Sequence, residues 1–342
     1  MIMEKESRFY ETFSENAIRC TICPHKCVIQ VGKRGFCNVK ENQKGRLMSL
    51  TYGQLSSIAI DPIEKKPLAH FLPGSKSFSI SSVGCNFTCP WCQNWHISAS
   101  KPGEITTCYT SPREVVAMAL RQECASIAYT YNEPVINLDY IEDVARSARE
   151  KDIKNVLVTN GYISREALAK VVDIIDAANV DWKAFNASFY RKYCAGNLQD
   201  VLDATVELKH NGVHVEVTFL VIPGTNDDKD ETQAMARFIV TELGPDIPLH
   251  LSRFFPHHEF RHLPSTPIET LYKAREIALD EGLRYVYVGN VSLDEYGDTF
   301  CHGCGEKVIE RRGYSISGWH LNAENRCLNC EEDIPIVGKP EA

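Results

Sequence analysis

The sequence predicts an α/β fold, a TIM-like barrel of β/α units that is either open or closed. Three observations predict it. Short runs rich in β-branched and aromatic residues recur between residues 76 and 295, amphipathic stretches of helical length separate them, and polar turn residues follow the runs. Because consecutive parallel strands need a crossover of helical length, this alternation favours β/α units wound around one parallel sheet.

Seven strands and six helices are expected in this region. The strands are predicted at 78–83, 126–131, 155–159, 180–183, 214–222, 249–254 and 285–289. The helices are predicted to start at residue types favoured at an N-cap or in a first turn, namely Pro112, Pro134, Ser164, Asp200, Asp230 and Pro267. In such a barrel the active site lies at the carboxyl ends of the strands. We therefore expect the polar motifs that follow the strands to share one rim.

Clusters of cysteine divide the chain into three predicted segments. A Cys-rich N-terminal segment spans 1–75, the barrel core spans 76–295, and a C-terminal segment spans 296–342. The clusters are, in that order, Cys20, Cys23, Cys27 and Cys37; Cys85, Cys89 and Cys92; and Cys301, Cys304, Cys327 and Cys330. The isolated thiols of Cys108, Cys124 and Cys194 are expected to be small buried apolar groups without chemistry.

Charge and composition narrow the function classes. The 342 residues carry 37 basic and 45 acidic side chains, and no run of Lys and Arg suits a phosphate backbone, so nucleic acid is not an expected partner. Charged residues interrupt the N-terminal region, and no stretch is apolar enough to span a bilayer. A cytoplasmic protein without membrane contact is expected, and reducing conditions there favour metal binding over disulfides for its clustered thiols.

The pattern Cys-x3-Cys-x2-Cys follows the first predicted strand, at Cys85, Cys89 and Cys92. Three thiolates on one loop suit three irons of a cubane 4Fe-4S cluster, whereas a four-cysteine ferredoxin site saturates all four. The fourth iron is then open to a small molecule. The alternative is a zinc site that borrows a fourth ligand such as His96.

The two terminal clusters predict further metal sites. Two Cys-x2-Cys pairs, Cys301 with Cys304 and Cys327 with Cys330, form a zinc-ribbon-like arrangement, for which zinc is the expected ion and a rubredoxin-type iron the alternative. The N-terminal spacing is less regular. It leaves zinc and an auxiliary iron–sulfur cluster open at Cys20, Cys23, Cys27 and Cys37, with His25 as a possible substitute ligand.

With Trp91 before the last cysteine, the loop resembles the Cys-x3-Cys-x-aromatic-Cys hallmark of the radical S-adenosylmethionine (SAM) superfamily. Nearly the whole chain resembles one branch of it, the radical SAM enzyme of the AmmeMemoRadiSam system, which is similar to pyruvate formate-lyase activating enzymes. The runs that carry this resemblance lie at 89–95, 128–134, 158–162, 181–185, 220–224 and 285–290.

The resemblance implies that Glu133 meets the methionine amino group of SAM. Glu133 stands where the superfamily has Gly-Gly-Glu-Pro, but Tyr131 and Asn132 replace the two glycines, which restricts the backbone. A plainer interpretation is an exposed first-turn acid favoured by the helix dipole.

The resemblance also implies other contacts with SAM. The further candidates are Trp91 at the adenine, His258 at the ribose, and Asn160, Asp181 and Lys183 at the ribose and carboxylate. Asp181 and Lys183 lie two apart on a strand and share a face, so a buried ion pair is the alternative.

The predicted function is reductive cleavage of SAM to a 5'-deoxyadenosyl radical that abstracts hydrogen from an unidentified substrate. One alternative is a glycyl radical enzyme activating enzyme, and an alternative of another class is a non-catalytic iron–sulfur or zinc module. The expected partners are a low-potential electron donor such as ferredoxin or flavodoxin, and Memo-like and AMMECR-like proteins implied by the resemblance.

Overall fold

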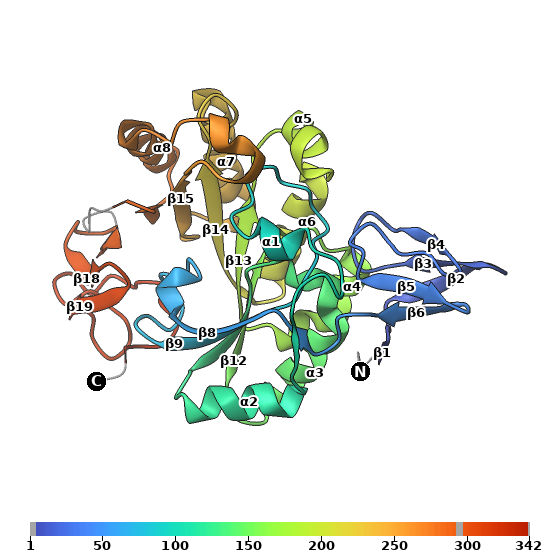
Figure 1. Ribbon diagram of the computed structural model, residues 1–342. Helices are drawn as coiled ribbons and strands as arrows, with labels where there is room; N and C mark the ends of the chain where they lie inside the picture. Colours follow the sequence, from blue (N-terminus) through green and yellow to red (C-terminus); the bar gives the residue numbers. More distant parts are fainter. Residues whose placement is uncertain (1–4, 292–296, 341–342) are drawn as a thin grey trace.

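The computed structural model describes residues 5–291 and 297–340 (Figure 1). Its central sheet has eight strands in the order β16-β15-β14-β13-β12-β11-β9-β8. The strands are β8 (Ser57–Pro62), β9 (Lys76–Ser81), β11 (Ser126–Tyr129), β12 (Lys154–Thr159), β13 (Ala177–Trp182), β14 (His214–Val221), β15 (Leu249–Arg253) and β16 (Val286–Gly289). The seven predicted strands are therefore all present, each within a few residues of its predicted bounds.

The strands from β9 to β16 are parallel to their neighbours, and β8 pairs antiparallel with β9. Within the described residues, the edge strands β8 and β16 are not paired with each other. The pairings thus describe an open sheet and do not confirm a barrel. Since neighbouring parallel strands point the same way, their carboxyl ends meet at one edge, where the predicted rim should lie.

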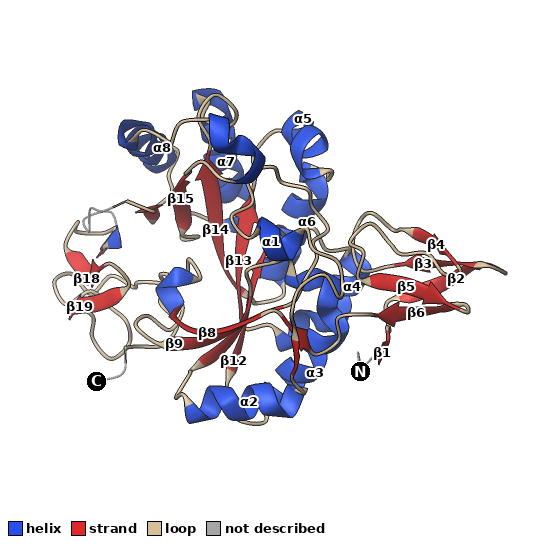
Figure 2. Ribbon diagram, in the orientation of Figure 1, coloured by secondary structure: helices blue, strands red, loops and turns tan. Residues whose placement is uncertain are grey.

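Helices connect the parallel strands, and Figure 2 shows them distributed around the outside of the sheet. The longer ones are α2 (Pro112–Arg121), α3 (Leu138–Arg149), α4 (Arg165–Val171), α6 (Leu198–His210), α7 (Lys229–Phe238) and α8 (Ile268–Asp280). Short ones are α1 (Trp95–Ser98), α5 (Ala187–Phe189), the 3₁₀ turns η1 (Ile63–Lys65), η2 (Pro134–Asn137), η3 (Val172–Ile174) and η6 (His258–His262), and the π turns η4 (Tyr190–Cys194) and η5 (Ile239–Leu243).

The predicted helix starts hold to within a few residues. Ser111 and Glu114 form a reciprocal capping box ahead of α2, and Ser164 caps α4 through the backbone N–H of Ala167. The helix predicted from Pro134 begins as the turn η2 before α3, and α6 begins two residues before Asp200 because Asn197 is its N-cap.

The N-terminal segment adds two small antiparallel sheets beside the central one, blue in Figure 1. One contains β1 (Lys5–Glu6), β6 (Arg46–Ser49) and β5 (Lys40–Gln43), and the other β2 (Tyr10–Ser14), β3 (Ala17–Cys20) and β4 (Val28–Gln30). A short pair joins β7 (Gln54–Leu55) to β10 (Cys108–Tyr109). The buried Lys40 pairs with the buried Asp139 of α3 at 2.7 Å, which ties this segment to the core.

The C-terminal segment, red at the opposite end in Figure 1, forms a three-stranded sheet of β17 (Thr299–Phe300), β18 (Lys307–Arg312) and β19 (Ser315–Trp319). Its apolar side chains share a buried cluster with Tyr285 and Tyr287 at β16. Val337 forms a parallel β-bridge with Phe71, and the side chain of Phe71 packs against residues of the central sheet. The C-terminal segment thus contacts both strand β16 and the chain between β8 and β9.

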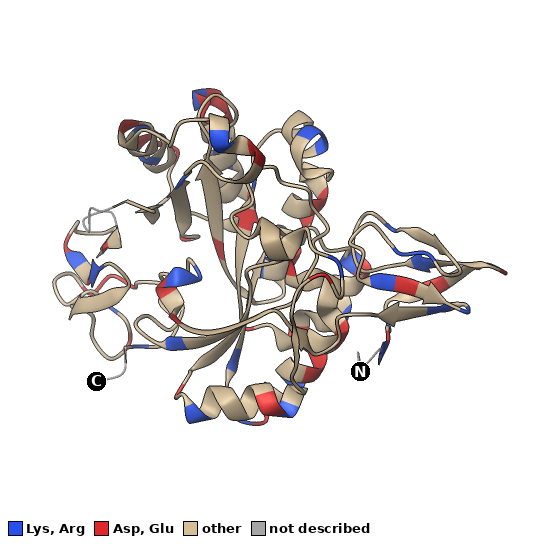
Figure 3. Ribbon diagram, in the orientation of Figure 1, with Lys and Arg blue, Asp and Glu red and all other residues tan. Residues whose placement is uncertain are grey.

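In the ribbon of Figure 3, positions occupied by basic residues and by acidic residues are interspersed along the helices and the terminal segments. A buried acid, Glu216 of β14, is satisfied by His214, His250 and the backbone N–H groups of Ala69 and His70. Glu216 lies near the start of its strand, opposite the carboxyl edge, so this network holds segments together away from the predicted site. No helix in the described ranges is both long and apolar enough to cross a membrane.

Candidate active site

The three-cysteine loop runs from the end of β9 to α1, at the carboxyl edge of the sheet. It starts at Gly84, whose φ of +89° favours glycine and whose added Cβ would lie 2.9 Å from the carbonyl oxygen of Cys37. The fully buried Asn86 fixes its middle by donating to the carbonyl of Tyr162 at 2.8 Å and accepting from the Asn160 amide at 2.9 Å. The loop is therefore held by strands β9 and β12 together.

The thiols of Cys85, Cys89 and Cys92 are all partly buried. Burial raises the pKa of Cys85 well above its usual value, and the charges of Glu133, Cys89 and Cys92 raise it further. Burial also raises the pKa of Cys92, whose sulfur lies 3.2 Å from the Ser98 hydroxyl. Such thiols stay protonated at neutral pH until a metal replaces the protons.

Cys194, predicted to have no chemistry, lies beside this loop. Its sulfur is 3.9 Å from that of Cys89, and this contact, together with burial, raises the pKa of Cys89. The carbonyl of Cys194 accepts from the backbone N–H of Thr88, and a Cβ at Gly196 would fall 2.4 Å from the ring of Phe87. Sequence spacing carries no signal for this contact, since 105 positions separate the two cysteines. Of the other isolated thiols, Cys124 is buried as predicted, but Cys108 is exposed on the short strand β10.

Glu133 is 3% exposed, which rules out the exposed first-turn interpretation. One carboxylate oxygen accepts from the Val135 N–H at 3.0 Å and the Thr159 hydroxyl at 2.7 Å, and the other accepts from the Asn160 N–H at 2.8 Å. Burial raises the pKa of Glu133 to about 7, although these hydrogen bonds oppose the rise. Glu133 is thus a buried acid at the carboxyl edge, held rigidly by its neighbours.

Tyr131 and Asn132, which stand where the superfamily motif has two glycines, form a turn in which Tyr131 adopts a left-handed backbone conformation. Tyr131 has φ +69°, a region that glycine enters more easily, and its hydroxyl donates to Asp61 of β8. Asn132 accepts from the Ser82 N–H at 3.2 Å and donates to the Gly84 carbonyl at 2.9 Å. Side-chain contacts therefore hold the strained turn, and Asp61 is a supporting residue that the motif did not reveal.

Asp181 and Lys183 lie at the end of β13 and form an ion pair at 2.5 Å. Although burial opposes it, the charges of Asp181 and Cys89 raise the pKa of Lys183, so this amine stays charged beside the cysteine loop. The ion pair is therefore present, with both side chains only partly buried, and the predicted contact with SAM stays a prediction. The second carboxylate oxygen of Asp181 is buried and has no hydrogen-bond partner among the described residues, which leaves an acceptor for a ligand.

The aromatic candidates are placed differently from each other. Trp91 is buried against Phe189 and Phe260, with ring centroids 5.2 Å and 5.6 Å away. His258 instead stacks on the exposed Trp95 at 5.0 Å with an interplanar angle of 9°. Trp91 belongs to the cysteine loop itself, and the turn that contains His258 contacts the loop, since the N–H of Glu259 donates to the carbonyl of Pro90 at 2.9 Å. The predicted adenine and ribose contacts stay predictions.

Comparison with known proteins identifies the family. The model of the radical SAM superfamily matches residues 79–239, from the first parallel strand to the end of α7. An uncharacterized protein of Methanocaldococcus jannaschii is 45% identical over 97% of this chain and 99% of its own length. The chain belongs to the radical SAM superfamily.

Two more distant comparisons are informative. The pyruvate formate-lyase 1-activating enzyme of Escherichia coli K12 is 22% identical over 52% of this chain and 72% of that enzyme. The structure of Streptococcus suis SuiB bound to precursor peptide SuiA covers 67% of this chain and 51% of SuiB, with 11% identity and a TM-score of 0.50, and it shows the fold alone.

Membership of the radical SAM superfamily implies a 4Fe-4S cluster and SAM as cofactors. The residues fit these groups: three partly buried thiols share a loop, and Glu133, Lys183 and a free oxygen of Asp181 lie at the same edge. A zinc site with His96 fits less well. Among the described residues, these three cysteines and His96 do not form a group with donor atoms within 4.8 Å of one another.

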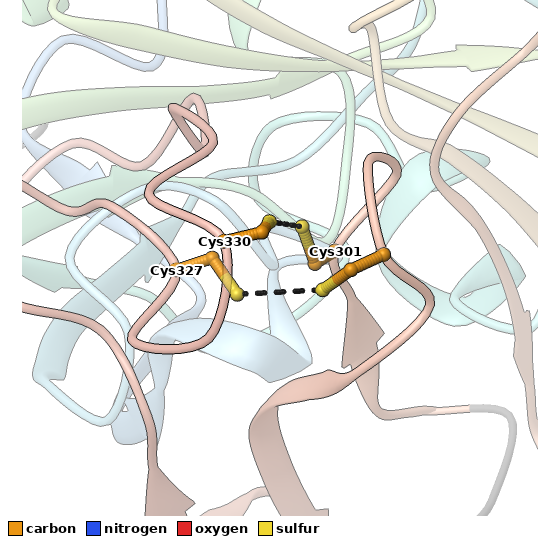
Figure 4. A group of neighbouring side chains, drawn as sticks. Cys301, Cys327 and Cys330 are labelled. Atoms are coloured by element: carbon orange, nitrogen blue, oxygen red, sulfur yellow. Dashed lines mark hydrogen bonds between the residues drawn. The ribbon is translucent and has the colours of Figure 1, made fainter.

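The C-terminal cysteines of this radical SAM protein do form such a group, as Figure 4 shows. The sulfur of Cys301 is 3.5 Å from that of Cys330, and the sulfur of Cys304 is 3.7 Å from that of Cys327. A single ion at about 2.3 Å from each sulfur requires spacing of this kind. The structure therefore confirms a four-cysteine site, while zinc as its ion stays a prediction.

The N-terminal cysteines are arranged differently. All four line one small cavity of about 20 Å³, together with His25 and largely apolar side chains. His25 itself is engaged elsewhere, since its Nε2 atom lies 2.9 Å from the carbonyl oxygen of Asn86.

Proposed function

We propose that this radical SAM protein binds SAM at the carboxyl edge of its sheet and cleaves it reductively to start hydrogen abstraction from a substrate. The observation that carries the proposal is the convergence of three thiols with Glu133 and the Asp181–Lys183 pair on that edge. Cys85, Cys89 and Cys92 would hold a 4Fe-4S cluster, which when bound would supply the electron for splitting SAM into methionine and a 5'-deoxyadenosyl radical able to take a hydrogen atom from the substrate.

The surrounding side chains bind and orient SAM in this proposal. The carboxylate of Glu133, preset by its contacts with Thr159 and Asn160, accepts from the methionine amino group. The charged amine of Lys183 attracts the methionine carboxylate, and the free oxygen of Asp181 accepts from a hydroxyl of the ribose. Asn160 positions the loop through Asn86. Trp91 and His258 are proposed to flank the adenine and the ribose.

Within the superfamily, we propose the AmmeMemoRadiSam branch, supported by the runs between residues 89 and 290 that carry the resemblance and by the N-terminal cysteines and C-terminal Cys-x2-Cys pairs, to which the resemblance extends. Its partners would be a low-potential ferredoxin or flavodoxin and the Memo-like and AMMECR-like proteins, in the cytoplasm. The match to the pyruvate formate-lyase 1-activating enzyme favours a second candidate, activation of a glycyl radical enzyme. Gene neighbourhood separates the two: a large glycyl radical enzyme beside this gene supports the second, and Memo-like and AMMECR-like neighbours support the first.

The experiment that tests SAM cleavage uses anaerobically purified protein, reduced with dithionite in the presence and absence of SAM. We expect SAM to change the electron paramagnetic resonance signal of the reduced cluster, and 5'-deoxyadenosine to form. A cluster signal indifferent to SAM, without deoxyadenosine, supports the non-catalytic module instead.

Replacing Glu133 by Ala is expected to weaken SAM binding while the iron content stays unchanged. Losing one charge-assisted hydrogen bond costs about 1.5 to 3 kcal/mol, which corresponds to roughly a ten-fold to hundred-fold rise in the dissociation constant. Equilibrium binding of SAM to the cluster-loaded protein measures the change.

The pH dependence of binding tests the same role. Because burial raises the pKa of Glu133 to about 7, the carboxylate needed as acceptor becomes more abundant as the pH rises from about 6 to 8. SAM affinity should rise over that range, and the rise should be lost in Glu133→Gln. Glu114→Ala, in the exposed capping box of α2, is the matched control and should bind SAM normally. An unchanged dissociation constant in Glu133→Ala would remove Glu133 from the ligand site.

A further inference from the structure

The four N-terminal cysteines surround one cavity although they come from separate parts of the N-terminal segment. Cys20 ends strand β3, Cys23 and Cys27 lie in the turn before β4, and Cys37 precedes β5. Cys20 and Cys23 are buried, and the remaining lining is largely apolar, with Ile22, Ile29, Phe36 and Ile136. The folded chain therefore gathers four thiols around one small cavity with a largely apolar lining.

The spacing of these sulfurs distinguishes them from the C-terminal four. Two sulfurs on one zinc ion, each at about 2.3 Å, lie at most about 4.6 Å apart. The C-terminal sulfurs meet such a limit, whereas among the described residues the N-terminal four do not form a group within 4.8 Å. Four thiols that face one cavity but lie too far apart to share one ion suit a polynuclear group whose several metal atoms each take one sulfur.

The surroundings also suit a negatively charged group. Lys40 lines the cavity, and its amine is buried in a pair with Asp139 of α3. A buried cation next to the cavity offsets part of the negative charge that four thiolates bring.

The cavity lies directly against the predicted catalytic loop. Asn86, the residue after Cys85, is part of its lining, and His25 bonds to the Asn86 carbonyl at 2.9 Å. Gly84, the residue before Cys85, packs so closely that an added Cβ would lie 2.9 Å from the Cys37 carbonyl oxygen. The cavity of the N-terminal cysteines and the Cys85–Cys92 loop are thus in direct contact, through the loop residues Gly84 and Asn86.

We propose that Cys20, Cys23, Cys27 and Cys37 hold a second iron–sulfur cluster that relays electrons to the cluster at Cys85. The relay rests on the proposed function, whereas the presence of the second cluster does not. In each transfer, a low-potential one-electron donor protein is oxidised by one electron, the second cluster is reduced and then reoxidised, and the Cys85 cluster gains that electron. All four N-terminal thiols are ligands, so this cluster has no position open to SAM.

Metal analysis of the full-length protein, purified anaerobically and reconstituted with iron and sulfide, tests the second cluster. We expect about eight irons per chain, two cubane clusters, falling by about four in Cys23→Ala/Cys27→Ala. The triple variant Cys85→Ala/Cys89→Ala/Cys92→Ala should keep about four irons, whether or not the protein cleaves SAM. Cys124→Ala, which removes an isolated buried thiol, is the control and should keep all of them. If the double variant loses zinc and keeps its iron, the proposal is wrong. A wild-type protein with only about four irons also overturns it.

The relay is tested by comparing electron donors. With flavodoxin or ferredoxin as donor, Cys23→Ala/Cys27→Ala should form 5'-deoxyadenosine at least ten-fold more slowly than wild type. With dithionite, a small reductant that can reach the Cys85 cluster directly, the rates should be similar. If the double variant and the wild type form 5'-deoxyadenosine at equal rates with the protein donor as well as with dithionite, the relay is wrong. If the double variant fails to fold, Mössbauer spectra of wild-type protein decide the cluster count, and a single four-iron cluster there overturns the proposal.

Discussion

Replacing Cys85, Cys89 and Cys92 together by Ala is expected to abolish 5'-deoxyadenosine formation. The three thiols are the predicted ligands of the cluster that supplies the cleaving electron, and no other described thiol shares their loop. Without them the carboxyl edge keeps Glu133 and Lys183 but has no reductant beside the bound SAM. The rate of 5'-deoxyadenosine formation should fall more than a thousand-fold, to the detection limit of a mass-spectrometric assay. Without the cluster, only the uncatalysed cleavage of SAM remains.

Cys194→Ala is the matched control for this result. Cys194 is a buried thiol 3.9 Å from Cys89, so its removal perturbs the same neighbourhood by a similar volume. If three thiolates hold the cluster and leave one iron open, Cys194→Ala should keep the iron and the deoxyadenosine activity. Loss of the cluster in Cys194→Ala would mean a four-thiolate site without an open iron, and retained turnover in the triple variant would remove the cluster from the mechanism.

Replacing Cys304 or Cys327 by Ser is expected to unfold the C-terminal segment without stopping SAM cleavage. About one zinc per chain should be released, because four thiolates on two Cys-x2-Cys pairs form a closed structural site. The segment is small, and its buried Cys301 and Cys327 pack in one cluster with Tyr285 and Tyr287, so losing the ion also loosens the contact with β16. Residues beyond Asp298 should become sensitive to protease, and deoxyadenosine should still form because the predicted catalytic loop follows β9 instead.

The exposed thiol of Cys108 provides the control for this second prediction. Cys108→Ser, on the short strand β10, should keep the metal and the protease resistance. If iron and sulfide, and no zinc, disappear with the C-terminal variants, the site is a redox centre and the structural role is wrong.

Much of the core could be predicted from the sequence because its information is local. A parallel strand buried on both faces is a continuous apolar run, and a helix start needs a particular cap within a few residues. Ser164 follows the capping rule, and the structure contains α4 there. The run 214–222 forms β14 although His214 and Glu216 interrupt its apolar character, because it is otherwise rich in the β-branched and aromatic residues that favour strands. Strand β8 was not predicted. It precedes the alternating strands and helices in the chain and joins the edge of the sheet by pairing antiparallel with β9.

The burial of Glu133 shows the limit of local patterns. An acid before a proline at a helix start is compatible with solvent exposure, and only packing against β12 gives it the Thr159 and Asn160 donors and raises its pKa to about 7. Likewise, Asp61 meets Tyr131 through contacts that join distant positions.

The sequence by itself indicated the groups of thiols that depend on short spacing along the chain. These are Cys85, Cys89 and Cys92, and the two Cys-x2-Cys pairs of the C-terminal segment. The sequence left open how distant segments meet, because contacts of that kind follow from the packing of whole elements and not from neighbouring residues. The tertiary structure alone decided that Cys194 lies beside Cys89, and that the four N-terminal thiols share one cavity against the backbone of Asn86. Side chains far apart in the chain become neighbours only when sheet and helices bury their apolar faces together, since that burial fixes which surfaces touch.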